Sequence, residues 1–123
     1  MQARLREAVV YTAKMLPILG PDIGKYLASW FNRGVFSVKP RGCAFPVYVR
    51  GRTSDAKCLY QVFCCEEYPV QEMENVACII DAGANVGYAT VYLRLHYSQA
   101  RILALEPEES NYDLLVRNTQ HYT

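Results

Sequence analysis

Two short apolar runs place the strongest constraint on how this chain can fold. The first is Val76–Ile80, and the second is Arg101–Leu105, which is apolar after its first residue. Strands buried on both faces have such continuous runs. The segment Gly87–Tyr97 between them carries apolar residues at helical spacing, and Pro107 opens another helix after the second run. This order predicts an α/β fold in which a βαβ unit holds two adjacent parallel strands with a right-handed crossover.

A glycine-rich turn joins the first predicted strand to the helix. It reads Asp81-Ala82-Gly83-Ala84-Asn85-Val86-Gly87, and open α/β sheets bind ligands where such strands end. Gly83 permits a tight turn and close approach of a ligand, and Gly87 lets the helix pack near the strand. The N–H groups at the helix start attract an anionic or polar ligand group. The turn is therefore a candidate binding site.

The spacing of this turn separates two classes of cofactor. A dinucleotide fingerprint requires G-x-G-x-x-G, but its second and third glycines would fall on Asn85 and Tyr88 here. The pattern that remains is D-x-G-x-N-x-G, with Asp81 at the strand end. It suits a ligand with a cationic amine and no pyrophosphate, which predicts the methionine moiety of S-adenosylmethionine.

Glu106, at the end of the second predicted strand, completes the candidate site. An acidic residue about 20 positions beyond the glycines can accept hydrogen bonds from ribose hydroxyls. Taken singly, the turn could be only a turn and Glu106 only a helix cap. Their conjunction around a βαβ unit predicts cofactor binding. The predicted cofactor-binding residues are Asp81, Gly83, Ala84, Asn85, Gly87 and Glu106.

Composition argues against several classes of partner. The chain has 123 residues, 51% of them hydrophobic, and a formal net charge of +1, so a core is expected and nucleic-acid binding is not. Its apolar runs never approach the ~20 residues of a membrane span. Lys14 also interrupts the N-terminal run too early for a signal peptide. We expect a cytoplasmic protein without a membrane partner.

The five cysteines and two histidines favour neither disulfides nor a metal site. The cysteine count is odd, Cys64 and Cys65 are adjacent, and no C-x-x-C is present. His96 and His121 have no partner at metal-ligand spacing. Reduced, mostly buried thiols and no metal are expected.

The first 46 residues are predicted to form two helices and the start of a hairpin. The first helix should end before Pro17, and the second should run from Pro21 to Gly34. The apolar stripe of the first consists of Leu5, Val9, Thr12 or Ala13, and Leu16. That of the second consists of Ile23, Leu27, Trp30 and Phe31. Either helix could lie on a membrane surface or bind a partner, but packing on its own domain is the more ordinary outcome.

A hairpin and a third helix are predicted next. Residues 35–38 and 45–49 have the composition of two strands around a turn. Pro46 cannot donate to a ladder, so this hairpin belongs at a sheet edge or outside the main sheet. Ser54 or Asp55 is expected to cap the helix that follows.

Three stretches carry similarity to a known family: IIDAGANVGY at residues 79–88, ALEPE at residues 104–108 and NYDLLVRN at residues 111–118. Together they resemble the FkbM family of S-adenosylmethionine-dependent methyltransferases. Residues 49–55, followed by Val62-Phe63 and Glu67-Tyr68, also look like that family's lead-in. The resemblance covers residues 47–119 and implies a methyltransferase domain at residues 47–123, after a helical and hairpin lead at residues 1–46.

This resemblance implies a class I, Rossmann-like methyltransferase fold and methyl transfer to an oxygen. The acceptor would be a small molecule or glycan, commonly a hydroxyl of a sugar or natural product. The glycine turn would line the methionine end of the cofactor, and Glu106 would hold the ribose. Asp55 and Tyr68 would lie near the cofactor mouth, unless they serve as a helix cap and a core aromatic. No catalytic base is assigned.

A methyltransferase sheet normally contains more strands than this chain predicts. The sequence therefore reads as the opening half of the fold, truncated after the second core strand and its following helix. Such a chain should bind cofactor weakly and transfer no methyl group by itself. Two alternatives stay open: a non-catalytic relic or interaction module that keeps the βαβ unit, and an NAD(P)-binding oxidoreductase fragment, which the glycine spacing opposes. The oligomeric state is left open.

Overall fold

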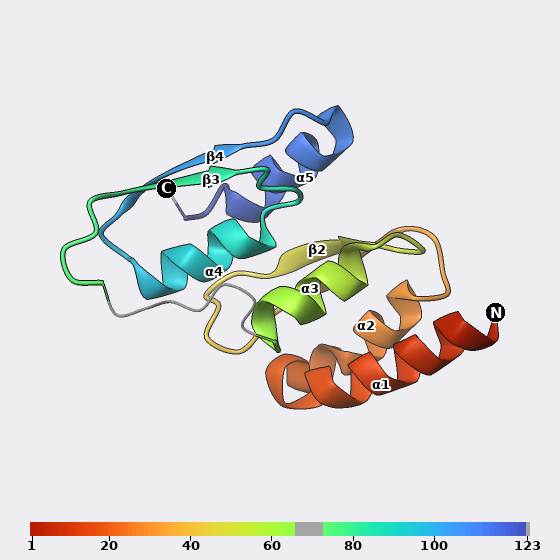
Figure 1. The fold of residues 1–123 in the computed structure, drawn as a ribbon. Helices are drawn as coiled ribbons and strands as arrows, with labels where there is room; N and C mark the ends of the chain where they lie inside the picture. The colour runs from red at the N-terminus through yellow and green to blue at the C-terminus, as the bar shows by residue number, and fades with distance from the viewer. Residues whose placement is uncertain (66–72, 123) are drawn as a thin grey trace. The chain divides into compact units, whose positions relative to one another are not determined.

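The computed structural model describes residues 1–65 and 73–122. The chain divides into two compact units, Met1–Glu66 and Glu67–Thr123 (Figure 1). The family-domain boundary expected between residues 46 and 47 rests on sequence similarity and stays a prediction.

In the first unit, helices pack against a small hairpin. The helices are α1 (Gln2–Leu19), α2 (Ile23–Ser29) and α3 (Asp55–Phe63), with the 3₁₀ turn η1 (Gly20–Asp22) before α2. Strands β1 (Val35–Val38) and β2 (Val47–Arg50) pair antiparallel in a sheet of their own. This confirms that the hairpin lies outside the main sheet. Pro46 immediately precedes β2, where its missing N–H costs no ladder bond.

Helix α1 does not end before Pro17, as the sequence predicted, but continues to Leu19. Leu19 is buried, and the Ile18 carbonyl accepts a hydrogen bond from the Arg41 N–H at 2.7 Å. These contacts offset the helical hydrogen bond that Pro17 removes.

The buried face of α1 also differs from the prediction. Ala8, Met15 and Leu19 are buried, whereas three residues of the predicted stripe are exposed: Leu5 by 52%, Val9 by 56% and Leu16 by 53%. Apolar residues surround most of this helix, so their spacing does not select one face. The prediction that this stripe forms the core contact is wrong.

Helix α2 is centred on Tyr26 instead of the predicted apolar stripe. Tyr26 is fully buried, and its hydroxyl donates a hydrogen bond to the Ala56 carbonyl at 2.7 Å. Burial raises the pKa of Tyr26 well above its ordinary value, so the hydroxyl remains a donor. Trp30 is buried as predicted, but Leu27 is 39% and Phe31 41% exposed.

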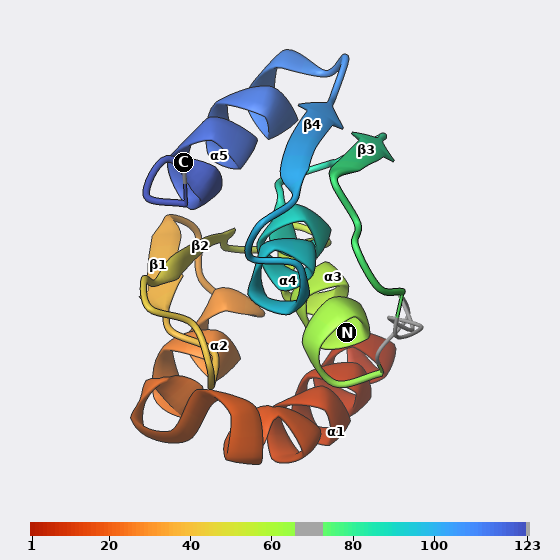
Figure 2. The ribbon, with the colours of Figure 1, turned by 90° about the vertical axis from the view of Figure 1, so that its left-hand side faces the viewer.

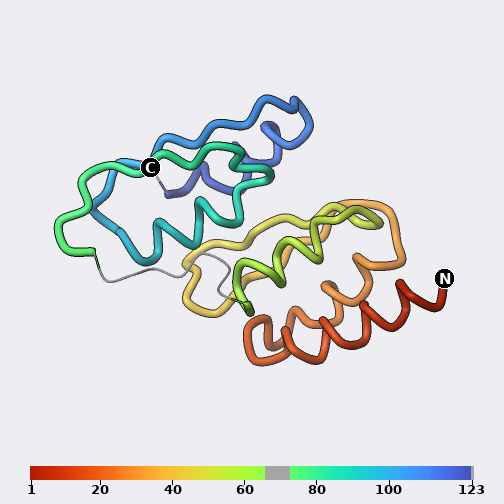
Figure 3. The backbone as a smooth tube through the Cα atoms, viewed as in Figure 1, coloured from red at the N-terminus to blue at the C-terminus, as the bar shows by residue number. Residues whose placement is uncertain are grey.

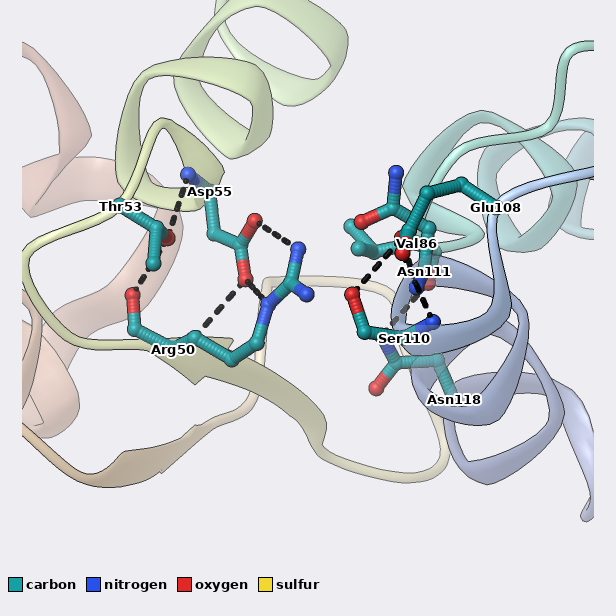
Figure 4. Close-up of polar contacts among 8 residues, drawn as sticks. All are labelled: Arg50, Thr53, Asp55, Val86, Glu108, Ser110, Asn111 and Asn118. Carbon is teal, nitrogen blue, oxygen red and sulfur yellow. Dashed lines mark hydrogen bonds and ion pairs between the residues drawn. The ribbon is translucent and has the colours of Figure 1, made fainter.

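A buried ion pair joins β2 to the start of α3. The Asp55 carboxylate, 1% exposed, accepts hydrogen bonds from the Arg50 backbone N–H at 3.0 Å and from the guanidinium Nε and Nη2 at 2.8 and 2.9 Å (Figure 4). The Thr53 hydroxyl accepts the Asp55 N–H at 3.1 Å. Ser54 occupies the N-cap position without a side-chain cap bond. The predicted cap by Ser54 or Asp55 is therefore replaced by Thr53.

The second unit contains the predicted βαβ unit. Strands β3 (Cys78–Ala82) and β4 (Arg101–Leu105) pair parallel, side by side (Figure 2). Helix α4 (Tyr88–His96) connects them, and α5 (Glu109–Thr119) follows β4. The predicted pairing of two adjacent parallel strands is thus confirmed, and the right-handed crossover stays a prediction.

One face of the β3–β4 pair is covered and the other is open. Figure 1 shows α4 and α5 on the same side of the strands. The residues turned to that side are partly buried: Ile79, Asp81, Ile102 and Ala104. The alternating side chains are exposed, among them Ile80, Leu103 and Leu105. The prediction that both faces are buried is thus wrong, because both helices of this unit cover the same face.

All five cysteines are free thiols. Of these, Cys43 is buried, whereas Cys65 and Cys78 are exposed and the other two are intermediate, so the expectation of mostly buried thiols is wrong. Among the described residues, no helix has the length and apolar character needed to cross a membrane.

Candidate functional site

The glycine turn holds three residues in the left-handed backbone region, alternating along the chain. Their φ angles are 75° for Gly83, 53° for Asn85 and 93° for Gly87. Glycine and asparagine adopt this region at the least cost. The D-x-G-x-N-x-G spacing therefore has its cause in these backbone angles. Figure 3 shows the chain reversing direction between β3 and α4.

Backbone hydrogen bonds tie the turn to the end of β4. The Gly83 and Ala84 N–H groups both donate to the Leu105 carbonyl at 2.9 Å, and the Gly87 N–H donates to the Ala84 carbonyl at 3.0 Å. The Ala84 side chain is buried. Ala84 thus shapes the turn, and its predicted contact with a cofactor stays a prediction.

The Glu106 carboxylate connects β4 to the same turn. Its Oε2 accepts a hydrogen bond from the Asn85 N–H at 2.7 Å, and its Oε1 accepts one from the Glu108 N–H at 3.0 Å. The structure therefore brings together the two halves of the predicted site. A carboxylate has about four acceptor positions, so Glu106 retains acceptor capacity for hydroxyl donors.

Asp81 lies inside β3, one residue before its end, on the helix-covered face. The Thr90 hydroxyl of α4 donates a hydrogen bond to its Oδ2 at 2.6 Å. Thr90 is 7% exposed, so this bond orients the carboxylate toward α4. An interaction of Asp81 with a cationic amine stays a prediction.

The two turn glycines have different surroundings. A Cβ on Gly87 would lie 2.8 Å from Leu115 Cδ1 and 3.4 Å from Leu115 Cα. Gly87 therefore permits α4 to start against α5, rather than against the strand as predicted. A Cβ on Gly83 would meet nothing within 4 Å. The backbone at Gly83 is open to the close approach of a ligand.

Two anchors of this region were not predicted from the sequence. Asn118, 2% exposed, donates from Nδ2 to the Val86 carbonyl at 2.8 Å (Figure 4). Its place on the apolar face of α5, three residues after Leu115, is the signal that could have revealed it. Thr90, which orients Asp81, is the other.

The N-cap of α5 is Glu108, one residue before the helix begins. Its carboxylate accepts hydrogen bonds from the Ser110 and Asn111 N–H groups at 3.1 and 2.7 Å (Figure 4). Glu108 thus satisfies two N–H groups at the start of α5, where a negative charge also interacts favourably with the helix dipole.

We expect Asn118→Ala to destabilise the second unit by about 2 kcal/mol, because it leaves the buried Val86 carbonyl without its donor. Amide hydrogen exchange of the β3 and β4 backbone measures this change. Gln120→Ala removes an exposed amide at the end of the same helix and should change exchange little. Equal protection in both variants would contradict an anchoring role for Asn118.

The family resemblance also names Asp55 and Tyr68 as residues near the cofactor mouth, and this stays a prediction. Asp55 lies in the first unit, in its ion pair with Arg50, and Tyr68 lies outside the described residues. A hollow of about 440 Å³ in the second unit is lined by residues that include Thr90, Ile102 and Tyr122 and by none of the six predicted cofactor residues. The candidate site is thus the open turn at the carboxyl ends of β3 and β4.

Comparison with known proteins points to one kind of enzyme. The chain is similar to methyltransferases. Methyltransferase sdnD of Sordaria araneosa is 38% identical over 65 residues, which are 52% of this chain and 25% of that protein. Methyltransferase 1 of Beauveria bassiana (strain ARSEF 2860) is 33% identical over 60 residues, 49% of this chain and 24% of that protein.

The matched part spans about a quarter of the length of these curated relatives. No protein-family model matches the chain, and no solved structure matches it. The similarities support a methyltransferase in general terms, so cofactor, family and methyl acceptor are matters for proposal.

Proposed function

We propose that this chain provides the S-adenosylmethionine-binding part of a methyltransferase of the FkbM type. The observation that carries the proposal is the hydrogen bond between Glu106 and the Asn85 N–H. It unites the glycine turn after β3 with the acidic residue after β4, and the pair occupies the edge where open α/β sheets bind ligands.

The residues present fit this cofactor. Gly83 leaves open space beside the backbone, so a ligand can approach the turn without meeting a side chain. The Glu106 carboxylate is oriented by two backbone N–H groups and can accept hydrogen bonds from neighbouring ribose hydroxyls. Asp81, oriented by Thr90, supplies negative charge near the start of the turn for an ammonium group.

When bound, the cofactor supplies a sulfonium methyl group for in-line transfer to an acceptor oxygen. This chain's residues contribute binding and orientation. Glu106 fixes the ribose, and the backbone at Gly83 bounds the methionine side. Fixing both ends sets the direction in which the methyl group points, and orientation of this kind is a large part of such catalysis.

A hydroxyl oxygen of a sugar or small natural product is the proposed acceptor class. The resemblance of residues 47–119 to FkbM methyltransferases supports this acceptor class, whereas the curated relatives support methyl transfer in general. The free thiols support a cytoplasmic location, because reducing compartments maintain unpaired cysteines.

A ligand-observed NMR titration of the purified chain tests the proposal. S-adenosylmethionine should bind weakly, since an open turn buries less of a ligand than a closed pocket does. Glu106→Gln should weaken binding by about tenfold or more, because hydrogen bonds to a charged group contribute roughly 1.5–3 kcal/mol. Glu109→Gln makes the same charge change in the first turn of α5 and should leave binding within a factor of about two.

NAD serves as the competing ligand in the same titration. Tighter binding of NAD than of S-adenosylmethionine would favour the oxidoreductase alternative. Absence of S-adenosylmethionine binding at millimolar concentration would favour a non-catalytic module. Equal binding by wild type and Glu106→Gln, with the fold retained by circular dichroism, would remove Glu106 from the site.

A further inference from the structure

The near-zero net charge of the chain conceals a division between its two units. Residues 1–66 contain ten Lys and Arg against four Asp and Glu, a formal charge of +6. Residues 67–123 contain three against eight, a formal charge of −5. The overall charge therefore does not exclude an anionic partner for the first unit, contrary to the sequence-based expectation. Such asymmetry is typical of chains that contact nucleic acid or a membrane.

Most of the positive charge in the first unit is not neutralised locally. The three carboxylates of residues 1–65 are already in ion pairs, Asp22 with Lys25, Asp55 with Arg50 and Glu7 with Lys57. Arg4, Arg6 and Arg52 of this unit form no ion pair with a carboxylate of the described residues.

The outer face of α1 adds an apolar surface to this charge. Leu5, Val9 and Leu16 are each more than half exposed, and their spacing of four and seven residues places them along one face of the 18-residue helix. Arg6 follows Leu5 and is exposed beside this stripe. A long helix with an exposed apolar stripe and flanking arginines is the form of helix that lies in a membrane interface.

A basic hollow adjoins the N-terminal end of this helix. It measures about 520 Å³ and is lined by Met1, Arg4, Phe31 and Arg52. Two guanidinium groups without carboxylate partners thus share one hollow with an aromatic ring that is 41% exposed. Guanidinium groups bind phosphate and carboxylate oxygens in bidentate fashion, and aromatic rings are enriched at the boundary between water and lipid.

We propose that the first unit docks on an anionic lipid surface through the outer face of α1. Leu5, Val9 and Leu16 insert among the lipid headgroups, and Arg4 and Arg52 bind headgroup phosphate or carboxylate. A lipid surface satisfies both features at once, the positive charge and the exposed apolar stripe. A nucleic acid would use the charge alone and leave the stripe in water. The proposal does not depend on methyl transfer.

Co-sedimentation of the chain with vesicles tests this docking. Vesicles of phosphatidylcholine with phosphatidylserine should bind the chain at least about tenfold more tightly than phosphatidylcholine alone, and added salt should weaken the binding. The double variant Arg4→Gln/Arg52→Gln should bind the anionic vesicles about tenfold less tightly or worse. The double variant Leu5→Ser/Val9→Ser should lose a comparable amount of vesicle affinity, because it removes the apolar side chains that insert among the headgroups.

Matched controls lie in the second unit. Ile80→Ser removes an apolar side chain that is 65% exposed, and Arg101→Gln removes an exposed positive charge. Both should bind vesicles within a factor of about two of wild type. Circular dichroism verifies that every variant is folded.

Three results would overturn the proposal. The first is absence of binding to anionic vesicles at low salt. The second is tighter binding to a DNA duplex with no effect of Leu5→Ser/Val9→Ser, which would assign the face to nucleic acid. The third is a concentration-dependent dimer of the wild-type chain, seen by light scattering. If Arg4→Gln/Arg52→Gln abolished this dimer and the variant still bound vesicles, the face would be assigned to a second copy of the chain.

Discussion

Substitution of Gly87 by alanine should destabilise the second unit by about 3 kcal/mol, from overpacking and from the cost of a left-handed alanine. The new methyl group would lie 2.8 Å from Leu115 Cδ1. Leu115 is 3% exposed in the core of this unit and has little room to move. The φ angle of 93° adds conformational strain for any residue with a Cβ. Amide hydrogen exchange of β3 and β4 measures the loss.

Gly83→Ala is the matched control for this prediction. Its φ of 75° brings similar backbone strain, but its Cβ would meet nothing within 4 Å. Gly83→Ala should therefore lower the free energy of unfolding of this unit by only about 1 kcal/mol. The affinity for S-adenosylmethionine should also fall, because the new methyl group occupies space through which the ligand approaches the turn. Equal destabilisation by both substitutions would contradict the packing role assigned to Gly87.

Substitution of Asp55 by alanine should destabilise the first unit by about 3–4 kcal/mol, since removal of one member of a buried ion pair leaves the other uncompensated. Asp55 is 1% exposed and holds both the backbone and the guanidinium of Arg50. The Arg50 side chain is 26% exposed. Solvent can therefore partly stabilise its charge after the substitution, which limits the loss of stability. Denaturant unfolding followed by the fluorescence of Trp30, the single tryptophan, reports on this unit.

Glu7→Ala supplies the control for the ion pair. Glu7 pairs with Lys57 at 3.6 Å, and both side chains are more than 40% exposed. Removal of such a surface pair should cost less than about 1 kcal/mol. If Asp55→Ala shifted the Trp30 transition no more than Glu7→Ala does, the ion pair would not hold β2 to α3.

Features with local causes were predictable from the sequence. The glycine turn follows from residues that tolerate a left-handed backbone at alternate positions, and Glu106 follows from its place at the next strand end. The parallel pairing of β3 and β4 follows from two apolar runs around a helical segment. Each of these depends on neighbours in sequence or on a general rule of βαβ connection.

Features set by tertiary packing were not predictable in the same way. The stripe of Leu5, Val9 and Leu16 has the spacing of a buried face, yet Ala8 and Met15 face the core instead. The choice depends on the shape of the helices that α1 meets, which spacing does not encode. The bond from Asn118 to the Val86 carbonyl likewise joins residues of the helix and turn that meet only after folding.

Backbone amide NMR of the chain titrated with S-adenosylmethionine tests the central claim most directly. The claim is that the turn from Asp81 to Gly87 and the tip of β4 at Glu106 form one cofactor site. The predicted result is a set of saturable shifts confined to the amides of the turn, Glu106 and the start of α4, reduced in Glu106→Gln. Saturable shifts that cluster elsewhere in the second unit, for instance around Ile102 and Tyr122, would contradict it.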